Sequence, residues 1–272
     1  MHKRHFRFLK CLFLYAAIIV FSSVLPVSVL ADDACWSAKQ QLAEVDEWVS
    51  VATVIDGDTV HLKDGRKIRF IGINTPEVGR NGKASEPFAH QAYLALKKLL
   101  SGHKKIGLSF DKDNKDRYKR VLAYIILPDG RSVGQFLLQQ GLAFSIAVPP
   151  NIKQINCFRT IETNAKRARA GVWQLPEMQL IAARDLSEKA KGYRFVTGKV
   201  AKYSEGKKSI YLKLTAKLSI RIAKKDRDYF AGLKLKSLVG KKLQIRGWLN
   251  HYKGRQSIFV RTGHNIQVLN RD

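Results

Sequence analysis

The sequence predicts an α+β protein built mainly of β-strands, and the order of its apolar runs is the reason. Short runs rich in β-branched residues are separated by Asp-Gly pairs, which is typical of hairpins. Three such runs are followed by a segment of helical periodicity and then by two further strand-like runs. This β-β-β-α-β-β order fits a five-stranded Greek-key barrel of the OB type, and the chain repeats it in outline after residue 192.

The first barrel is predicted to begin with a three-stranded meander. Asp56-Gly57 and Asp64-Gly65 separate its strands, because a D-G pair between apolar runs is a strong turn signal. The predicted strands are 51–55, 59–63 and 67–73, and a polar loop from 74 to 85 follows them.

A helix is predicted next, with Ser85 as its N-cap, an end near Leu100 and Gly102 as the stop signal. The face carrying Phe88, Ala92, Leu96 and Leu99/Leu100 is expected to lie in the core. Two more strands are predicted at 105–111 and 121–127, followed by helices at 133–140 and 155–170. Trp173, just beyond the last helix, is expected to fill the core.

The chain is predicted to hold a first domain at 32–182, a lysine-rich linker at 183–192 and a second domain at 193–272. Gly198 is expected to mark a bulge that lets a small barrel bend. Barrels of this kind bind oligonucleotides or oligosaccharides on one face. The predicted strands of the second barrel are 193–203, 209–214, 218–222, 243–249 and 257–262, with a helical piece at 226–238.

Residues 1–31 are predicted to be a secretory signal peptide that is cleaved after Ala31. Four cations precede an apolar run from Cys11 to about Leu30, which is typical of such a signal. An uncleaved membrane anchor is the alternative, because the run is nearly long enough to span a bilayer. Pro26 and the small residue at the cut favour cleavage. The mature chain is then expected in the periplasm or outside the cell, without stable membrane insertion.

Cys35 and Cys157 are the two cysteines that remain after cleavage. Two cysteines in an exported protein favour one disulfide, although a pair of buried thiols is the alternative. The sequence contains no CxxC pair and no Cys/His cluster of the kind that binds zinc.

The net charge of +27 is distributed unevenly. Residues 193–272 carry 20 Lys/Arg against 4 Asp/Glu, a net +16. A basic surface of this density attracts polyphosphates and releases their counterions on binding. A solubilising charge, or adhesion to an anionic cell envelope, explains the composition equally well, so charge alone does not decide for nucleic acid.

Hard oxygen donors gather in the segments I-D-G-D-T and N-T-P-E. Asp58 begins the strand after the D-G turn, and Asn74 and Thr75 lie where the third strand is predicted to end. Because antiparallel strands are neighbours, these oxygens can meet at one end of the sheet. Donor sets made of oxygen alone favour Ca²⁺ or Mg²⁺ over zinc. Read by themselves, Asp56 and Asp58 would more often be ordinary turn residues.

Two arginines suit an anionic reaction centre. Cleaving a phosphodiester adds negative charge in the transition state, which guanidinium groups and a divalent cation stabilise. Arg69 lies on the third predicted strand, and Arg120 opens the strand after the charged loop 112–120. Taken singly, each would more often be a surface arginine.

These segments, together with D-R-Y-K-R-V-L-A-Y from Asp116 to Tyr124, resemble the staphylococcal nuclease (thermonuclease) family over roughly residues 50–175. The resemblance implies a Ca²⁺ ion (Mg²⁺ is less favoured) held by Asp58, the side chain of Asn74 and the backbone carbonyl of Thr75. Asp56 would contact these ligands and not the metal itself. It also implies roles for residues at the scissile phosphate: Arg69 and Arg120 as guanidinium clamps, Glu77 as general base, and Tyr118 as a phosphate contact. A packing role is the alternative for Tyr118.

The chain departs from the family pattern in two places. Residue 74 is commonly Asp in the family, whereas Asn74 keeps a carbonyl oxygen without charge and should bind calcium more weakly. Family members carry tyrosines after the segment that matches Gly141–Ala143, whereas this chain has Ala147 and Pro149. Aromatic residues of the second barrel are expected to stack bases instead, although at least half of them should be core. These are Tyr203, Tyr211, Trp248, Tyr252 and Phe259.

The sequence therefore predicts an exported, metal-dependent endonuclease acting on DNA and/or RNA, with a basic second domain that supplies affinity. No protein partner is predicted. The alternative is a catalytically silent module that binds nucleic acid or anionic envelope polymers. Arg69, Glu77 and Arg120 are all present, which favours activity, whereas Asn74 favours the silent module.

Overall fold

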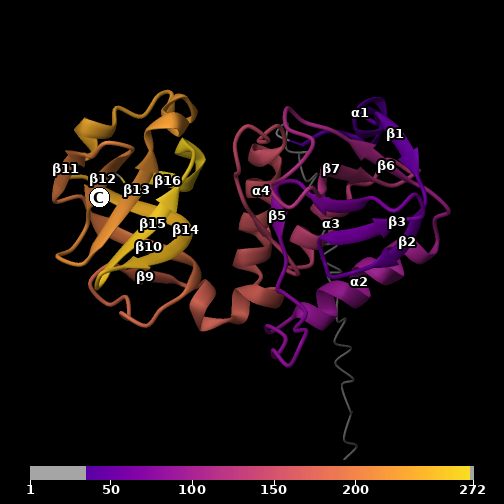
Figure 1. Ribbon diagram of the computed structural model, residues 1–272, viewed down its shortest axis with the longest axis horizontal. Helices are drawn as coiled ribbons and strands as arrows, with labels where there is room; N and C mark the ends of the chain where they lie inside the picture. Colours follow the sequence, from indigo (N-terminus) through magenta and orange to yellow (C-terminus); the bar gives the residue numbers. More distant parts are fainter. Residues whose placement is uncertain (1–34, 270–272) are drawn as a thin grey trace, which may run out of the picture. The chain divides into compact units, whose positions relative to one another are not determined.

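The computed structural model describes residues 35–269, which Figure 1 draws as a coloured ribbon. The predicted signal peptide and its cleavage site lie outside the described residues. Within residues 35–269, no helix has both the length and the apolar character needed to cross a membrane.

The first barrel closes because its first strand is split in two. The halves β1 (Glu47–Val49) and β2 (Val51–Val54) are separated by Ser50 alone and lie at opposite ends of the strand order β1-β6-β7-β4-β3-β2. β4 and β7 are parallel, and the other pairs are antiparallel. This confirms the predicted OB arrangement. The remaining strands are β3 (Thr59–Leu62), β4 (Lys67–Phe70), β6 (Ile106–Ser109) and β7 (Val121–Ile126).

The third predicted strand, 67–73, is wrong in its last part. β4 ends at Phe70, and β5 (Ile73–Asn74) pairs instead with β8 (Phe144–Ser145), outside the barrel sheet. The chain bends at Gly72, which has φ +80°, and a Cβ there would lie 2.7 Å from the Phe158 ring. Asn74 therefore lies in a separate two-stranded ribbon, and Thr75 follows that ribbon instead of the end of a barrel strand.

The main helix of the barrel, α2 (Ala89–Ser101), begins later than predicted. Its N-cap is Phe88, in the left-handed conformation at φ 68° and without a side-chain cap. The Ser85 hydroxyl is not the cap; it accepts a hydrogen bond from Gly79 N at 3.0 Å within the preceding loop. The helix ends at Gly102 as predicted, and Ala92, Leu96 and Leu100 are buried.

Three further helices pack around this barrel: α1 (Ala38–Ala43), α3 (Val133–Gln139) and α4 (Ile155–Arg167). Helix α1 was not predicted; the Ser37 side chain caps it by accepting a hydrogen bond from the Gln40 N–H. A Cys35–Cys157 disulfide, with Cα atoms 4.6 Å apart, joins the segment before α1 to the first turn of α4 and confirms the predicted bridge. Trp173, in the 3₁₀ helix η1 (Gly171–Gln174), is 2% exposed, as predicted.

The second barrel repeats the topology of the first. Its strand order is β11-β12-β13-β15-β14-β10, with β10 and β11 as the halves of the first strand and β13 parallel to β15. The predicted helical piece forms two 3₁₀ helices, η3 (Lys224–Phe230) and η4 (Leu235–Leu238). The strands are β10 (Gly192–Lys199), β11 (Lys202–Glu205), β12 (Ser209–Lys213), β13 (Leu218–Ala223), β14 (Lys242–Tyr252) and β15 (Arg255–Val260). Short additions are η2 (Pro176–Met178), β9 (Leu180–Ala182) beside β10, η5 (Gly263–Asn265), and β16 (Ile266–Leu269) on β14.

The segment 183–192 packs closely on the second barrel. Ala183 and Leu186 are buried in its core. Gly198 does not form the predicted bulge, because β10 pairs with β14 in continuous register from Gly192 to Lys199. A Cβ on Gly198 would lie 2.9 Å from the Ala183 Cβ, so this glycine permits a close approach instead. The predicted domain boundaries stay a prediction.

A third apolar cluster is shared between the two barrels. It combines Phe144, Val172 and Trp173 with Tyr193 and Phe195 of β10. The Trp173 and Phe195 rings meet edge to face at 5.5 Å between centroids. Besides its own core, each barrel therefore contributes to a common one.

A buried ion pair crosses this shared cluster. Arg246 of β14 donates from Nη2 to Glu162 Oε1 at 2.8 Å and to the Ser145 carbonyl at 2.7 Å, and its Nη1 bonds Glu162 Oε2. Its Nε donates to the Tyr193 hydroxyl at 3.1 Å. The Glu162 side chain is 2% exposed. Burial alone would raise the pKa of Glu162, but Arg246 holds that pKa below its usual value.

Candidate active site

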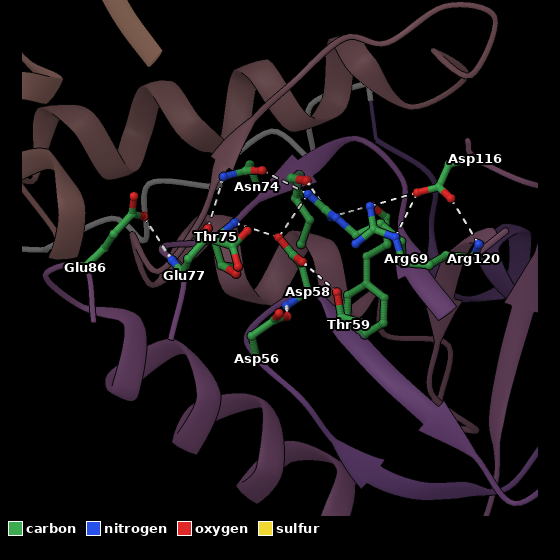
Figure 2. A network of polar contacts seen from close by, with 12 residues as sticks. Asp56, Asp58, Thr59, Arg69, Asn74, Thr75, Glu77, Glu86, Asp116 and Arg120 are labelled. Atoms are coloured by element: carbon green, nitrogen blue, oxygen red, sulfur yellow. Dashed lines mark hydrogen bonds and ion pairs between the residues drawn. The ribbon is translucent and has the colours of Figure 1, made fainter. Parts of the chain in front are cut away.

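Asp58 lies buried at the start of β3, where the I-D-G-D-T turn places it. The Asp58 N–H donates to Asp56 Oδ1 at 3.0 Å, a local bond that fixes the turn. Asp58 Oδ1 accepts from the Thr59 hydroxyl at 3.1 Å, and Oδ2 accepts from the Thr75 N–H at 2.8 Å (Figure 2). This last bond fastens the chain after β5 to the turn before β3. Asp58 and Thr75 thus meet as predicted, although they meet through β5 and not through a barrel strand.

Arg69 projects from β4 between these two segments. Its Nη2 lies 3.1 Å from Asp58 Oδ2 and 2.9 Å from Asn74 Oδ1 (Figure 2). Its Nη1 donates to the carbonyls of Phe70 and Ile73 at 2.9 and 3.0 Å. The backbone of the bend after β4 therefore holds the guanidinium in place.

The predicted metal ligands converge on one small region. Because Asp58 Oδ2 and Asn74 Oδ1 both contact the same nitrogen of Arg69, the two oxygens lie close together. The Asn74 amide also donates to the Thr75 carbonyl at 3.0 Å. Within residues 35–269, no group of three or more His, Cys, Asp or Glu side chains is arranged to hold a metal ion. The set here instead offers one carboxylate, one amide and one backbone carbonyl, which suits a hard cation that keeps several waters.

The carboxylates of Asp56, Asp58 and Glu77 face this region, and the pKa values of Asp56 and Glu77 are raised there. Burial, and then the charge of Asp58, raise the pKa of Asp56. Burial, and then the charges of Asp58 and Asp56, raise the pKa of Glu77. The Glu77 backbone N–H donates to Glu86 Oε2 at 2.9 Å, which holds the N-T-P-E segment against the following loop. Such a concentration of negative charge beside Arg69 favours a bound cation.

Arg120 is held by an acidic residue that the sequence analysis did not single out. Asp116 Oδ2 accepts from Arg120 Nε at 2.8 Å, and Asp116 Oδ1 accepts from the N–H groups of Tyr118 and Arg120 at 2.8 and 3.0 Å. Asp116 therefore fixes the conformation of the last part of the charged loop, residues 116–120. Asp116 lies four residues before Arg120 and opens the D-R-Y-K-R motif, and this spacing could have indicated the ion pair.

Tyr118 is 64% exposed, which does not fit a packing role. Its ring lies between two guanidinium groups, with Arg117 Cζ at 4.7 Å and Arg120 Cζ at 5.6 Å from the centroid. The Arg117 guanidinium also donates to the Tyr118 hydroxyl at 2.6 Å. The side chain is thus exposed next to Arg120, although it does not line the pocket that Arg120 borders.

Arg69 and Arg120 border a common pocket of about 190 Å³. Asp116, Ile146 and Asn151 line it as well, and Val148 is 42% exposed at its edge. Both arginines therefore line one pocket, and their contact with a single phosphate stays a prediction. Ala147, where the family pattern has tyrosine, is buried and offers no stacking surface.

The second-barrel aromatics differ from expectation. At least half were expected to be core, yet none of the five is buried. Tyr252 is 74% and Trp248 39% exposed. Tyr203, Tyr211 and Phe259 are half-buried.

A closed OB barrel with an acid–amide–arginine cluster beside a two-arginine pocket is the arrangement that the sequence resemblance to nucleases implies. The family described as "Staphylococcal nuclease homologue" matches residues 67–175. Over 127 residues the chain is 33% identical to a thermonuclease of Staphylococcus intermedius, which covers 46% of this chain and 74% of that protein. The chain therefore belongs to the staphylococcal nuclease family.

Two relatives from Bacillus subtilis (strain 168) are matched over part of their length. The chain is 36% identical over 130 residues to "Endonuclease YncB", covering 46% of this chain and 61% of that protein. It is 34% identical over 130 residues to the "SPbeta prophage-derived endonuclease YokF", covering 46% of this chain and 43% of that protein. The family match ends at residue 175, before the second barrel begins.

Proposed function

We propose that this protein is an exported, Ca²⁺-dependent endonuclease that hydrolyses phosphodiester bonds of DNA and/or RNA. One observation carries the proposal: Arg69 touches both side-chain ligands of the candidate cation site, Asp58 and Asn74, and also lines the pocket that Arg120 borders. A phosphate in that pocket would contact both guanidinium groups next to a cation. The relatives described as endonucleases and thermonucleases support the same reaction class.

Each site residue then has a chemical role. A cation held by Asp58, Asn74 and the Thr75 carbonyl would supply positive charge to a phosphate oxygen. Arg69 and Arg120 stabilise the charge that builds on the phosphate as a water oxygen bonds to phosphorus and a P–O bond to sugar breaks. Glu77 accepts the proton of that water, and its raised pKa suits a general base. The leaving sugar oxygen takes its proton from solvent.

The remaining parts of the proposal concern location and affinity. Residues 1–31 direct export, in keeping with the Cys35–Cys157 disulfide, which is typical of oxidising compartments. The second barrel, with most of the net positive charge, supplies affinity for the nucleic acid backbone. The family match does not extend to this barrel.

Cleavage by protein beginning at Asp32 tests the chemistry, with plasmid DNA and with RNA, in Ca²⁺ and in excess chelator. Arg69→Ala and Arg120→Ala should each lower the single-turnover rate roughly a hundred- to a thousandfold, because each removes a preorganised donor. Arg131→Ala is the matched control. Arg131 makes the same Nε and backbone N–H bonds to Asp129 that Arg120 makes to Asp116, but it does not line the pocket.

A silent binding module is the second candidate, and Asn74 is the observation that favours it. It predicts tight binding without cleavage in any metal ion, and equal behaviour of wild type and Arg69→Ala in the cleavage assay. Chelator-sensitive cleavage that Arg69→Ala abolishes would exclude the silent module.

A further inference from the structure

The outer face of the second barrel carries a row of side chains that crosses four strands. Strand register places Tyr211 beside Arg221, Arg221 beside Phe259, and Phe259 beside Trp248. Their sequence neighbours on β12, β13 and β15 are buried in the barrel core, so these side chains point to the opposite, outer face. The Arg221 guanidinium lies 4.2 Å from the centroid of the Phe259 ring. At about 4.8 Å per strand, the row spans about 14 Å.

The surface around this row is basic and hollowed. A hollow of about 650 Å³ lies over the strands, and none of the residues that line it is Asp or Glu. Its lining combines five cations with two tyrosines. The cations are Lys202, Lys213, Lys217, Arg221 and Arg255. Lys217 is neutralised by Glu188, so four remain available to a polyanion.

Trp248 joins this row to the candidate active site. It meets the Tyr193 ring edge on, at 4.7 Å between centroids, and remains 39% exposed. It also lines a groove of about 330 Å³ together with Asn74, Pro76 and Arg194. Trp248 of the second barrel and Asn74 of the candidate site therefore line the same groove, as do the acidic residues Glu86 and Glu177.

We infer that this face binds a single strand of DNA or RNA and leads it over Trp248 to the cleavage site. The inference rests on the proposed nuclease function. Unpaired bases stack on aromatic rings while Lys and Arg contact the phosphates, which is how many OB barrels bind single strands without sequence preference. In a duplex the base faces are already stacked, so a row of rings offers it little. The aromatic row thus favours single strands, whereas the lysines alone would not discriminate.

Deleting the second barrel is a poor test, because it would leave Glu162 unpaired and uncover the shared cluster around Trp173. Point variants of the full chain, in an inactive Glu77→Gln background, avoid this problem. The probe is a labelled single strand of about 16 nucleotides, compared with a duplex of the same sequence.

Phe259→Ala and Trp248→Ala should each weaken single-strand binding by about 5- to 150-fold, as expected for loss of one stacked base. Duplex affinity should change less than twofold. Trp48→Ala is the matched control, since Trp48 is 40% exposed on β1 of the first barrel. Trp248→Phe keeps a stacking ring against Tyr193 and should bind nearly as well as the parent, which separates stacking from misfolding.

Arg255→Ala tests the charge of the same face. It should lower the slope of log affinity against log salt on single strands by about 0.7, as loss of one phosphate contact does. Phe259→Ala should leave that slope unchanged, because stacking releases no counterions.

The link to the active site is tested in the active chain. Trp248→Ala should lower the ratio of kcat/KM for a long single strand to that for a dinucleotide at least fivefold. If wild type cleaves neither substrate, the proposed nuclease function is wrong. The binding measurements still show whether the outer face of the second barrel binds a single strand. Equal single-strand affinity of Trp248→Ala, Phe259→Ala and Trp48→Ala would overturn the inference. So would tighter binding of an anionic polysaccharide than of the single strand.

Discussion

Arg246→Ala is expected to be far more destabilising than loss of an ordinary ion pair. The Glu162 carboxylate is 2% exposed and receives three hydrogen bonds, two from Arg246 and one from the Ser145 N–H at 2.7 Å. Without Arg246, a buried charge keeps one backbone donor. Breaking a buried pair in this way costs about 3–5 kcal/mol. By contrast, Arg246→Met combined with Glu162→Leu removes both charges and should be neutral or up to about 4 kcal/mol stabilising.

Urea unfolding of the full chain measures these differences. The control is Arg131→Ala, which breaks an exposed pair with Asp129 and should cost about 0–1 kcal/mol. Fluorescence of Trp173, which packs against Phe195 in the shared cluster, reports on the interface. A loss below 1 kcal/mol for Arg246→Ala, or a double variant as unstable as the single one, would refute a desolvated charge pair at this position.

Three further predictions concern the metal, the disulfide and one buried lysine. Asn74→Asp should lower the Ca²⁺ concentration for half-maximal rate, because it adds charge to a ligand; an unchanged or higher requirement would mean that residue 74 is not a ligand. Cys35→Ser with Cys157→Ser should lower the free energy of unfolding by up to about 4–5 kcal/mol, since the bridge closes a long loop; equal stability with and without reductant would contradict this. Burial lowers the pKa of Lys166 to about 8, from a usual value of 10.5. Between these two pH values Lys166 is protonated in the unfolded chain and neutral in the folded one. The contribution of Lys166 to the free energy of unfolding therefore rises with pH across that window. Lys166→Met should remove that rise, whereas exposed Lys98→Met should not, as pH-dependent unfolding would show.

The order of strands and helices along both barrels could be predicted because it depends on local signals. Short loops join β2, β3 and β4, so the register of β3 on β4 follows from the turns. Asp-Gly pairs and the alternation of apolar residues are visible in one sequence. The disulfide followed from counting cysteines in a chain expected to be exported.

The sequence predictions are wrong where residues distant in the sequence determine the local structure. The bend at Gly72 depends on the Phe158 ring, which comes from α4, and nothing in the run 67–73 signals it. The Ser85 hydroxyl is a good cap by propensity, yet a loop bond to Gly79 takes it. None of the five second-barrel aromatics is buried, and among them only Tyr203 packs against that barrel's core, because burial depends on which face of each strand turns outward.

The shared core lay beyond prediction for the same reason. Glu162 and Arg246 are separated by 84 residues and belong to different barrels. A glutamate on a helix and an arginine on a strand are normally surface residues, so their types gave no sign of burial. Glu162 and Arg246 meet because both barrels pack against the shared cluster.

Helix α4 also limits which deletions and substitutions the fold tolerates. Its Cys157 is bonded to the start of the described chain, and its Glu162 depends on a residue of the second barrel. Deleting the second barrel alone would remove the Arg246 partner of Glu162 and expose the apolar residues of the shared cluster, so that loss has to be accompanied by changes on this face of the first barrel. We therefore expect charge at 162 and at 246 to be gained and lost together among relatives. Family members that consist of a single barrel have no counterpart of residue 246 and need no charge at 162.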